Sequence, residues 1–291
     1  MSACANWSSN ATTFATNSTV GSHPHGILIN TNNMIYVTDQ ENSRILVWLN
    51  DTINSTNIIS ATLLSPEAVF VTRIGDIYVD NGHVYGRVDK WAMNRNISVP
   101  AMYVGTACYG LFVDINDILY CSMTNSHQVV TRSLHSSSNT TKIVAGLGCP
   151  GSTSNMLYYP NGIFVDINFD LYVADCNNSR IQLFKSGQLN GITVAGNGSL
   201  NTTITLNWPT GIVLDADNYL FIVDSSNNHI LRSGPNGFWC LFGCSGSWGS
   251  SSNELYHPQN MAFDSYGNIF VTDKENSRVQ KFLLSTNSCS K

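Results

Sequence analysis

The side chains with the most varied chemistry in this chain occupy one repeated position. Six times, a Pro or an equivalent residue is followed by a polar or aromatic residue that differs at each occurrence. These residues are His25, Glu67, Tyr109, Asn161, Thr210 and Gln259. A group of unlike side chains that can accept, donate or carry charge suits an asymmetric ligand-binding pocket. Solvated residues at the ends of loops would have a similar composition, and the sequence leaves both interpretations open.

A second repeated pattern places an Arg five residues after an Asp. The pairs are Asp39 with Arg44, Asp175 with Arg180, and Asp273 with Arg278. The fixed spacing predicts an ion pair that holds a loop inside one repeat. In the fifth repeat His229 replaces the Arg and Asp224 stays, whereas in the third repeat we assign the two places to Met123 and His127. This assignment would leave His127 free for another role.

Both patterns belong to a longer repeat that runs six times along the chain. The repeats lie near residues 23–48, 65–91, 107–130, 159–184, 208–232 and 257–282. Each contains two apolar runs with a turn between them. The aromatic residue of the second run recurs after 42, 42, 52, 49 and 49 residues, which is a period typical of radial β-repeats.

The fourth repeat shows most clearly how one unit should fold. Residues 163–165, 171–173, 180–184 and 192–195 are β-branched or aromatic runs bounded by Asn, Asp and Gly, so each predicts a short strand. A β-sandwich also has strands at this spacing, but its strands need not resemble one another. We therefore predict an all-β chain that forms one domain over residues 1–291, a six-bladed β-propeller of four-stranded blades.

The last repeat has only three strands before the chain ends. Residues 10–15 resemble the fourth strand of the fourth repeat, at 191–196. We predict that the N-terminal strand completes the last blade, because this pairing removes an exposed sheet edge. The same closure would place Cys4 beside Cys289 and predicts a disulfide between them.

The second strand, the loop after it and the start of the third strand carry a recognisable motif. Residues 171–182 read Leu-Tyr-Val-Ala-Asp-Cys-Asn-Asn-Ser-Arg-Ile-Gln, with similar segments at 35–45 and 269–279. The motif resembles the NHL repeat family, whose members fold as six-bladed β-propellers. The resemblance covers about residues 5 to 285. It implies the fold and not a particular activity, because one fold hosts many functions.

A weaker resemblance connects the chain to one enzyme of this fold, peptidyl-amidoglycolate lyase, which holds zinc with histidines on the channel face. The segments around His25 and His127 are similar to two of its histidine-bearing segments, and His229 is the nearest third. Three imidazoles would suit Zn²⁺ with one position left open. The chain departs from the pattern because Asp175, and not a tyrosine, precedes Cys176. A histidine in a loop is also more often an ordinary surface residue.

Cysteine content and glycosylation motifs point to a compartment. The chain has eight cysteines, ten Asn-x-Ser/Thr sequons and only 11% charged residues, which favours an oxidising, extracellular setting and a glycoprotein. Besides Cys4 with Cys289, we expect disulfides joining Cys149 with Cys176, Cys108 with Cys121, and Cys240 with Cys244. The last pair requires a turn over residues 241–243, because residues four apart in an extended strand are too distant to be bonded.

The charge balance weighs against nucleic acid as a partner. Fourteen Lys and Arg against nineteen Asp and Glu give a net charge of -5, and a phosphate-neutralising surface needs the opposite excess. The sequence contains no run of 18 apolar residues, so it predicts no transmembrane helix. The first residues also lack an apolar signal-peptide core. A processed or partial chain would reconcile that absence with secretion.

Together these features predict a function class. We expect a non-enzymatic, extracellular NHL-repeat propeller that binds a protein or a small ligand on its channel-mouth face, without a cofactor. The alternative is a zinc-dependent lyase or hydrolase that uses His25, His127 and His229.

Overall fold

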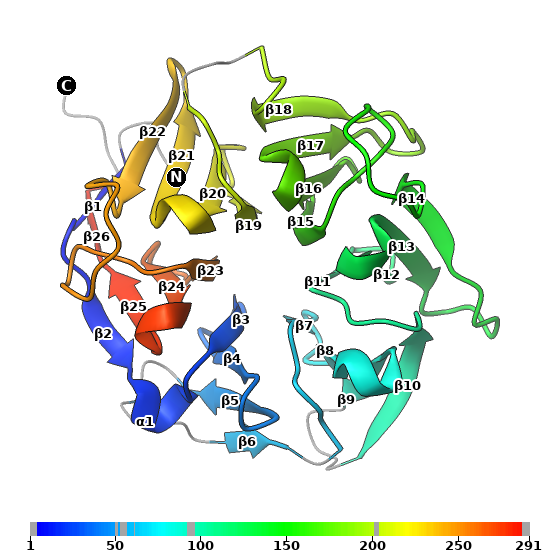
Figure 1. The fold of residues 1–291 in the computed structure, drawn as a ribbon. Helices are drawn as coiled ribbons and strands as arrows, with labels where there is room; N and C mark the ends of the chain where they lie inside the picture. Colours follow the sequence, from blue (N-terminus) through cyan, green and yellow to red (C-terminus); the bar gives the residue numbers. More distant parts are fainter. Residues whose placement is uncertain are drawn as a thin grey trace.

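Six antiparallel sheets of four strands and one sheet of two strands make up the described molecule. The computed structural model describes residues 5–49, 52, 57–60, 62–91, 97–200 and 204–286. The four-stranded sheets are arranged around a central axis as the blades of a six-bladed β-propeller (Figure 1). The fold class predicted from the sequence is confirmed.

The strands of each blade follow the chain from the centre outwards. Blade one contains β3 (Pro24–Ile29), β4 (Ile35–Asp39), β5 (Arg44–Trp48) and β6 (Asn57–Ile59). Blade two contains β7 (Val69–Val71), β8 (Ile77–Asp80), β9 (Arg87–Trp91) and β10 (Ser98–Tyr103). Blade three contains β11 (Gly110–Val113), β12 (Ile118–Met123), β13 (Gln128–Ser133) and β14 (Lys142–Gly146).

The second half of the ring repeats this order. Blade four contains β15 (Pro160–Val165), β16 (Leu171–Asp175), β17 (Arg180–Phe184) and β18 (Ile192–Gly196). Blade five contains β19 (Pro209–Leu214), β20 (Leu220–Asp224), β21 (His229–Gly234) and β22 (Gly237–Phe242). Blade six contains β23 (Pro258–Phe263), β24 (Ile269–Asp273), β25 (Arg278–Phe282) and, from the other end of the chain, β2 (Thr12–Ala15).

Short helical turns connect some of these strands. The described α-helices are α1 (Asn17–Val20) and α2 (Gly82–Tyr85). Single 3₁₀ turns follow the second strand of blades three to six, at η1 (Thr124–Ser126), η2 (Cys176–Asn178), η3 (Ser225–Asn227) and η4 (Lys274–Asn276). No helix in the described ranges is long and apolar enough to cross a bilayer.

The N-terminal segment closes the ring, as the sequence predicts. Thr12 and Thr13 of β2 pair with Lys281 and Gln280 of β25, so the last blade gains its fourth strand. The structure adds a second pairing that the sequence did not reveal. β1 (Asn6–Trp7) pairs with β26 (Leu284–Thr286), the strand that follows β25. The proposed Cys4–Cys289 disulfide lies outside the described residues.

Apolar side chains between neighbouring blades form the core. Each of the six blade interfaces holds its own buried hydrophobic cluster. This follows from strand geometry, because alternate side chains of a blade face opposite neighbours. The β-branched and aromatic residues of the strands fill these spaces. The core is therefore a ring of packed layers around the channel.

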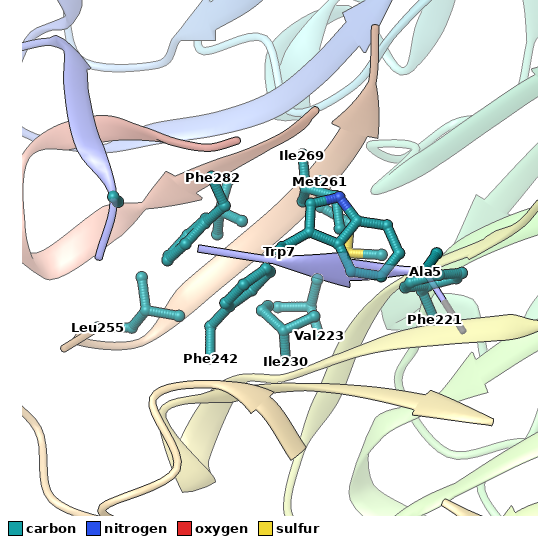
Figure 2. Packing of buried hydrophobic residues seen from close by; sticks show 12 residues of the cluster. Ala5, Trp7, Phe221, Val223, Ile230, Phe242, Leu255, Met261, Ile269 and Phe282 are labelled. Atoms are coloured by element: carbon teal, nitrogen blue, oxygen red, sulfur yellow. The ribbon is translucent and has the colours of Figure 1, made fainter. Parts of the chain in front are cut away.

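Trp7 fastens the closure between blades five and six. Figure 2 shows its indole among side chains of both blades, including Phe221 and Met261. The indole nitrogen donates a hydrogen bond to the carbonyl of Gly267 at 2.8 Å, and its ring meets that of Phe221 edge-on at 5.8 Å. Trp7 is only 5% exposed. Trp7, which precedes the first repeat in the sequence, thus joins blades five and six.

Candidate functional site

The six variable residues lie where the innermost strands begin. His25, Asn161, Thr210 and Gln259 are the second residues of their strands, and Glu67 and Tyr109 stand just before theirs. These inner strands contact one another in order around the channel (Figure 1). The six residues therefore form a ring, which we call the mouth ring, at one end of the channel. All except the half-buried Tyr109 are at most 9% exposed, so they are not solvated loop ends.

Hydroxyl groups from neighbouring blades anchor the backbone of the mouth ring. Thr272 of blade six donates to the carbonyl of His25 at 2.8 Å, and Thr38 of blade one donates to that of Glu67 at 3.3 Å. Ser122 of blade three bonds the carbonyl of Asn161 in the same way. These bonds use only main-chain atoms of the ring residues. Among the ring side chains, Thr210 donates to the carbonyl of Pro258 at 3.4 Å and Gln259 donates to the hydroxyl of Ser225 at 3.3 Å.

Blades one to three bring a histidine, a carboxylate and a phenol together. Nδ1 of His25 lies 3.0 Å from the carbonyl oxygen of Glu67, and Nε2 lies 3.5 Å from its carboxylate. Gln40 donates to the same carboxylate at 2.6 Å. The ring of Tyr109 meets His25 edge-on at 5.8 Å, and its hydroxyl is hydrogen-bonded to Glu67. Burial, followed by the charge of Glu67, raises the pKa of Tyr109.

A second buried acid lies beside this group. Asp80 is fully buried and accepts hydrogen bonds from the amides of Cys108 at 2.8 Å and Gly82 at 3.1 Å. Burial, reinforced by the negative charge of Glu67, raises the pKa of Asp80 to about 8. In most blades the equivalent Asp is paired with a basic residue, but Arg87 of blade two pairs with Asp89 at 2.8 Å. Asp80 is thus a carboxyl group that favours its neutral form.

Blades four to six present a different surface, made of aromatic rings. Tyr158 and Tyr159 are stacked at 5.1 Å, and Trp208 follows at 6.1 Å from Tyr159. Trp248 stacks on Tyr256 at 5.0 Å in the loop that enters blade six. We call these five residues the aromatic arc. Tyr159 and Trp208 immediately precede the Pro that begins an inner strand, so the arc borders the mouth ring.

The backbone beneath the arc adopts a costly conformation. Tyr159 and Trp208 have φ of 55°, and His257 has φ of 45°. Bulky side chains rarely occupy this left-handed region, and each instance costs on the order of 1–3 kcal/mol. These residues were not predicted from the sequence, because the position considered in each repeat follows the Pro, whereas they precede it. A Tyr, Trp or His directly before the repeated Pro was the available signal.

The Asp–Arg pairs form as the sequence predicts. Nε of the Arg lies 2.6, 2.7 and 2.6 Å from the Asp carboxylate in blades one, four and six. Arg180 also donates to the carbonyls of Ser152, Thr153 and Met156, which holds the entry loop of its blade. In blade five, Nε2 of His229 lies 2.9 Å from Asp224 and occupies the place of the Arg. His229 is therefore a scaffold residue.

His127 holds two blades together, and its assigned place in the repeat was wrong. The strand register pairs Met123 with Gln128, as it pairs Asp175 with Arg180, so Gln128 stands in the place of the Arg. His127 instead occupies the left-handed position that ends η1, with φ of 52°. Its Nδ1 accepts a hydrogen bond from the amide of Tyr159 at 3.2 Å. Burial lowers the pKa of His127, which favours the neutral ring that this bond requires.

The three histidines do not gather into a metal site. Among the residues that the structure describes, no three His, Cys, Asp or Glu side chains lie close enough together to hold a metal ion. His25 contacts Glu67, His127 contacts Tyr159 and His229 contacts Asp224. The convergence of His25, His127 and His229 expected from the sequence is therefore not found.

Of the three expected disulfides that lie within the described residues, two are present. Cys108 is bonded to Cys121, and Cys240 to Cys244. The second pair is possible because Gly243 turns the chain with φ of 70°, in a space where a Cβ would lie 2.1 Å from the carbonyl oxygen of Asn228.

The predicted bond between Cys149 and Cys176 was wrong. Both are free thiols, Cys149 exposed and Cys176 buried. The loops that carry them do meet, since Asn178 donates to the carbonyl of Gly151 at 2.8 Å. The Cys176 thiol points the other way, however, and donates to the carbonyl of Pro209 in blade five at 2.7 Å. Thr124 bonds Pro160 in the same manner one blade earlier, so Cys176 is an interblade donor.

Fold and repeat together define the class of protein. Residues 255–282 match the model of the NHL repeat. The chain is thus a six-bladed β-propeller that carries an NHL repeat, as the motif at 171–182 indicates. No curated protein sequence matches the chain.

Solved propeller structures are similar over nearly the whole chain. An auxiliary nutrient binding protein from Bacteroides ovatus has a TM-score of 0.72 and 14% identity, with 96% of this chain and 73% of that one covered. The protein of the same description from Bacteroides thetaiotaomicron has a TM-score of 0.70 and 14% identity, covering 91% and 70%. Virginiamycin B lyase from Staphylococcus aureus has a TM-score of 0.64 and 15% identity, covering 94% and 99%. At these identities the similarity establishes the fold alone.

Proposed function

We propose that this propeller is a non-enzymatic binding protein whose mouth ring and aromatic arc hold a neutral, polyhydroxylated ligand of the carbohydrate class. The observation that carries the proposal is the aromatic arc beside Asn161, Thr210 and Gln259. Flat aromatic faces pack against the apolar face of a sugar ring, while amides and hydroxyls bond its hydroxyl groups. The half of the ring formed by these three residues is uncharged, which suits a neutral ligand.

Backbone strain under the arc supports the same proposal. The left-handed backbone before the Pro belongs to the repeat, because Ser65 has φ of 47° at the same place in blade two. A bulky Tyr, Trp or His in this conformation costs more than the Asn or Gly that would adopt it readily. Strain of this kind gathers at ligand sites, where it holds side chains in a required direction. The two similar structures from Bacteroides are described as nutrient binding proteins, which agrees with a binding role.

An extracellular setting belongs to the proposal. Two disulfides are present among the described residues, and such bonds persist in oxidising compartments. Six of the ten sequon asparagines are described, and all six are exposed: Asn6, Asn10, Asn17, Asn139, Asn177 and Asn197. Each could accept a glycan without disturbing the core.

Titration with neutral mono- and oligosaccharides, followed by calorimetry and tryptophan fluorescence, tests the proposal. We expect at least one of these sugars to bind saturably, and Trp208→Asn to weaken it about tenfold or more. Asn tolerates the left-handed backbone, so this variant keeps the fold. Trp239→Ala is the matched control, because Trp239 is also 37% exposed but lies on the outer strand β22. No saturable binding, or equal affinity in Trp208→Asn, would contradict the proposal.

The zinc-dependent lyase or hydrolase considered from the sequence lacks a gathered set of ligands in the described residues, and elemental analysis of the purified protein tests it against the binding protein. Stoichiometric zinc that is lost in both His25→Ala and His127→Ala would favour the enzyme. Protein that binds a sugar and contains no zinc would support the binding protein.

A further inference from the structure

A cavity of about 300 Å³ lies at the end of the channel opposite the mouth ring. The inner strands β11, β15 and β19 begin at the mouth ring and end at this cavity, where each enters a tight turn. Phe112, Phe164, Phe169 and Leu214 are among the apolar residues of its wall. A cavity of this size and lining suits the body of a small organic molecule.

The turns that border the cavity expose isoleucines to solvent. Ile115 is 80% exposed and Ile167 is 84% exposed, and both line the cavity. A neighbouring hollow of about 310 Å³ shares Ile115 and adds Ile74, which is 84% exposed. Single exposed apolar residues are ordinary, but several in adjoining turns around a hollow indicate a binding surface. The turns of blades one and six carry Thr31 and Ser265 at the place of Ile167, so the fold does not require isoleucine there.

Three carboxylates stand in the wall of the same cavity. Asp114, Asp166 and Asp215 each begin one of the turns. Asp114 accepts a hydrogen bond from the hydroxyl of Tyr120 at 3.2 Å, and Asp215 lies 3.8 Å from Arg232.

Asp166 differs from the other two carboxylates. One of its oxygens accepts the turn amides of Asn168 at 2.8 Å and Asp170 at 2.9 Å. In the described part of the chain no Lys, Arg or His lies within ion-pair distance of Asp166, and nearby Lys185 is paired with Asp170 at 2.6 Å. The cavity thus has an apolar wall with a negative carboxylate at its edge.

We propose that this cavity binds a small amphiphilic cation, with its apolar body between Phe112, Phe164 and Leu214 and its ammonium group on Asp166. An apolar molecule gains by leaving water for this wall. An ammonium group gains both a hydrogen bond and an ion pair with the carboxylate, whereas a neutral alcohol of the same shape gains only the hydrogen bond and an anion is repelled. The second site is independent of the mouth ring, so it stands whether or not a sugar binds at the other end.

Calorimetric titration with naphthylmethylamine at neutral pH tests the second site. The isosteric alcohol naphthylmethanol and the anion naphthoate are the comparison probes. We expect the amine to bind about tenfold or more tightly than the alcohol, and naphthoate to bind most weakly. Equal affinity of the amine and the alcohol, or no saturable binding of the amine, would overturn the proposal.

Equivalent turns in other blades show which substitutions should preserve the turn. Asn30 in blade one accepts the same two turn amides as Asp166, at 3.0 and 2.9 Å, so Asp166→Asn removes the charge and keeps the hydrogen bonds. We expect this variant to bind the amine and the alcohol equally. Ile167→Thr should weaken both probes alike. Asp264→Asn, at the same place in blade six and outside the cavity, is the control and should bind like the unaltered protein. A tenfold preference for the amine that survives Asp166→Asn would contradict the assignment.

Discussion

At the scale of single residues, Asp80 should make stability depend on pH. Its folded pKa of about 8 lies above the 3.8 of an ordinary Asp, so folding favours the protonated form. The stabilisation is complete below about pH 4 and is lost as pH rises through about 8. We therefore expect unfolding experiments from pH 4 to pH 9 to show the unaltered protein losing stability relative to Asp80→Asn. A difference between the two proteins that does not change with pH would contradict the assigned pKa.

Residue types alone located part of the site. Comparing equivalent positions found the mouth ring and the Asp–Arg pairs, because both recur at a fixed offset. The same comparison was wrong for His127. That loop differs from the repeat at Met123 and Gln128, so His127 was aligned with the Arg of the other repeats in place of Gln128. The comparison failed for Cys176 because loop adjacency does not determine which way a thiol points. The place of His127 in its loop and the direction of the Cys176 thiol both depend on three-dimensional packing.

At the scale of the elements, Arg180 should be important for blade four. It is 6% exposed, and its partner Asp175 is fully buried. Burial already raises the pKa of Asp175 although Arg180 is present. Arg180→Ala would leave this acid buried without its cation and release three carbonyls of the entry loop. We expect it to lower the free energy of unfolding by about 3–5 kcal/mol, measured by urea denaturation.

Two further variants calibrate that measurement. Arg180→His copies the pair of His229 with Asp224 in blade five and should cost less than Arg180→Ala. Arg73→Ala removes an exposed arginine and should change stability by less than about 0.5 kcal/mol. Similar losses in all three variants would show that the buried pair is not the cause.

Strands were more predictable than their accessory contacts. The β-branched and aromatic runs, with their Asn, Asp and Gly boundaries, predicted four strands per blade and the use of residues 10–15 as the missing one. The pairing of β1 with β26 was not foreseen, because two- and three-residue strands leave no periodic pattern to detect. Their position depends on Trp7, whose burial is a property of the assembled ring.

At the scale of the whole molecule, Trp7 should determine how firmly the ring closes. Trp7→Ala would empty a space between blades five and six and leave the carbonyl of Gly267 without its donor. We expect a loss of about 3–5 kcal/mol in the free energy of unfolding, measured by chemical denaturation. Trp248→Ala is the control, because Trp248 is 65% exposed and should contribute much less. Equal losses in the two variants would mean that the closure does not depend on Trp7.

The hydroxyl groups that anchor the mouth ring have a consequence for how such a protein can evolve. Thr272, Thr38 and Ser122 bond the main-chain carbonyls of His25, Glu67 and Asn161 and not their side chains. The geometry of these three positions is therefore set by the neighbouring blade, whichever side chain occupies them. His, Glu and Asn already share this arrangement in one molecule. A lineage of such propellers could exchange its recognition residues one at a time, and so acquire new ligands while its architecture stays unchanged.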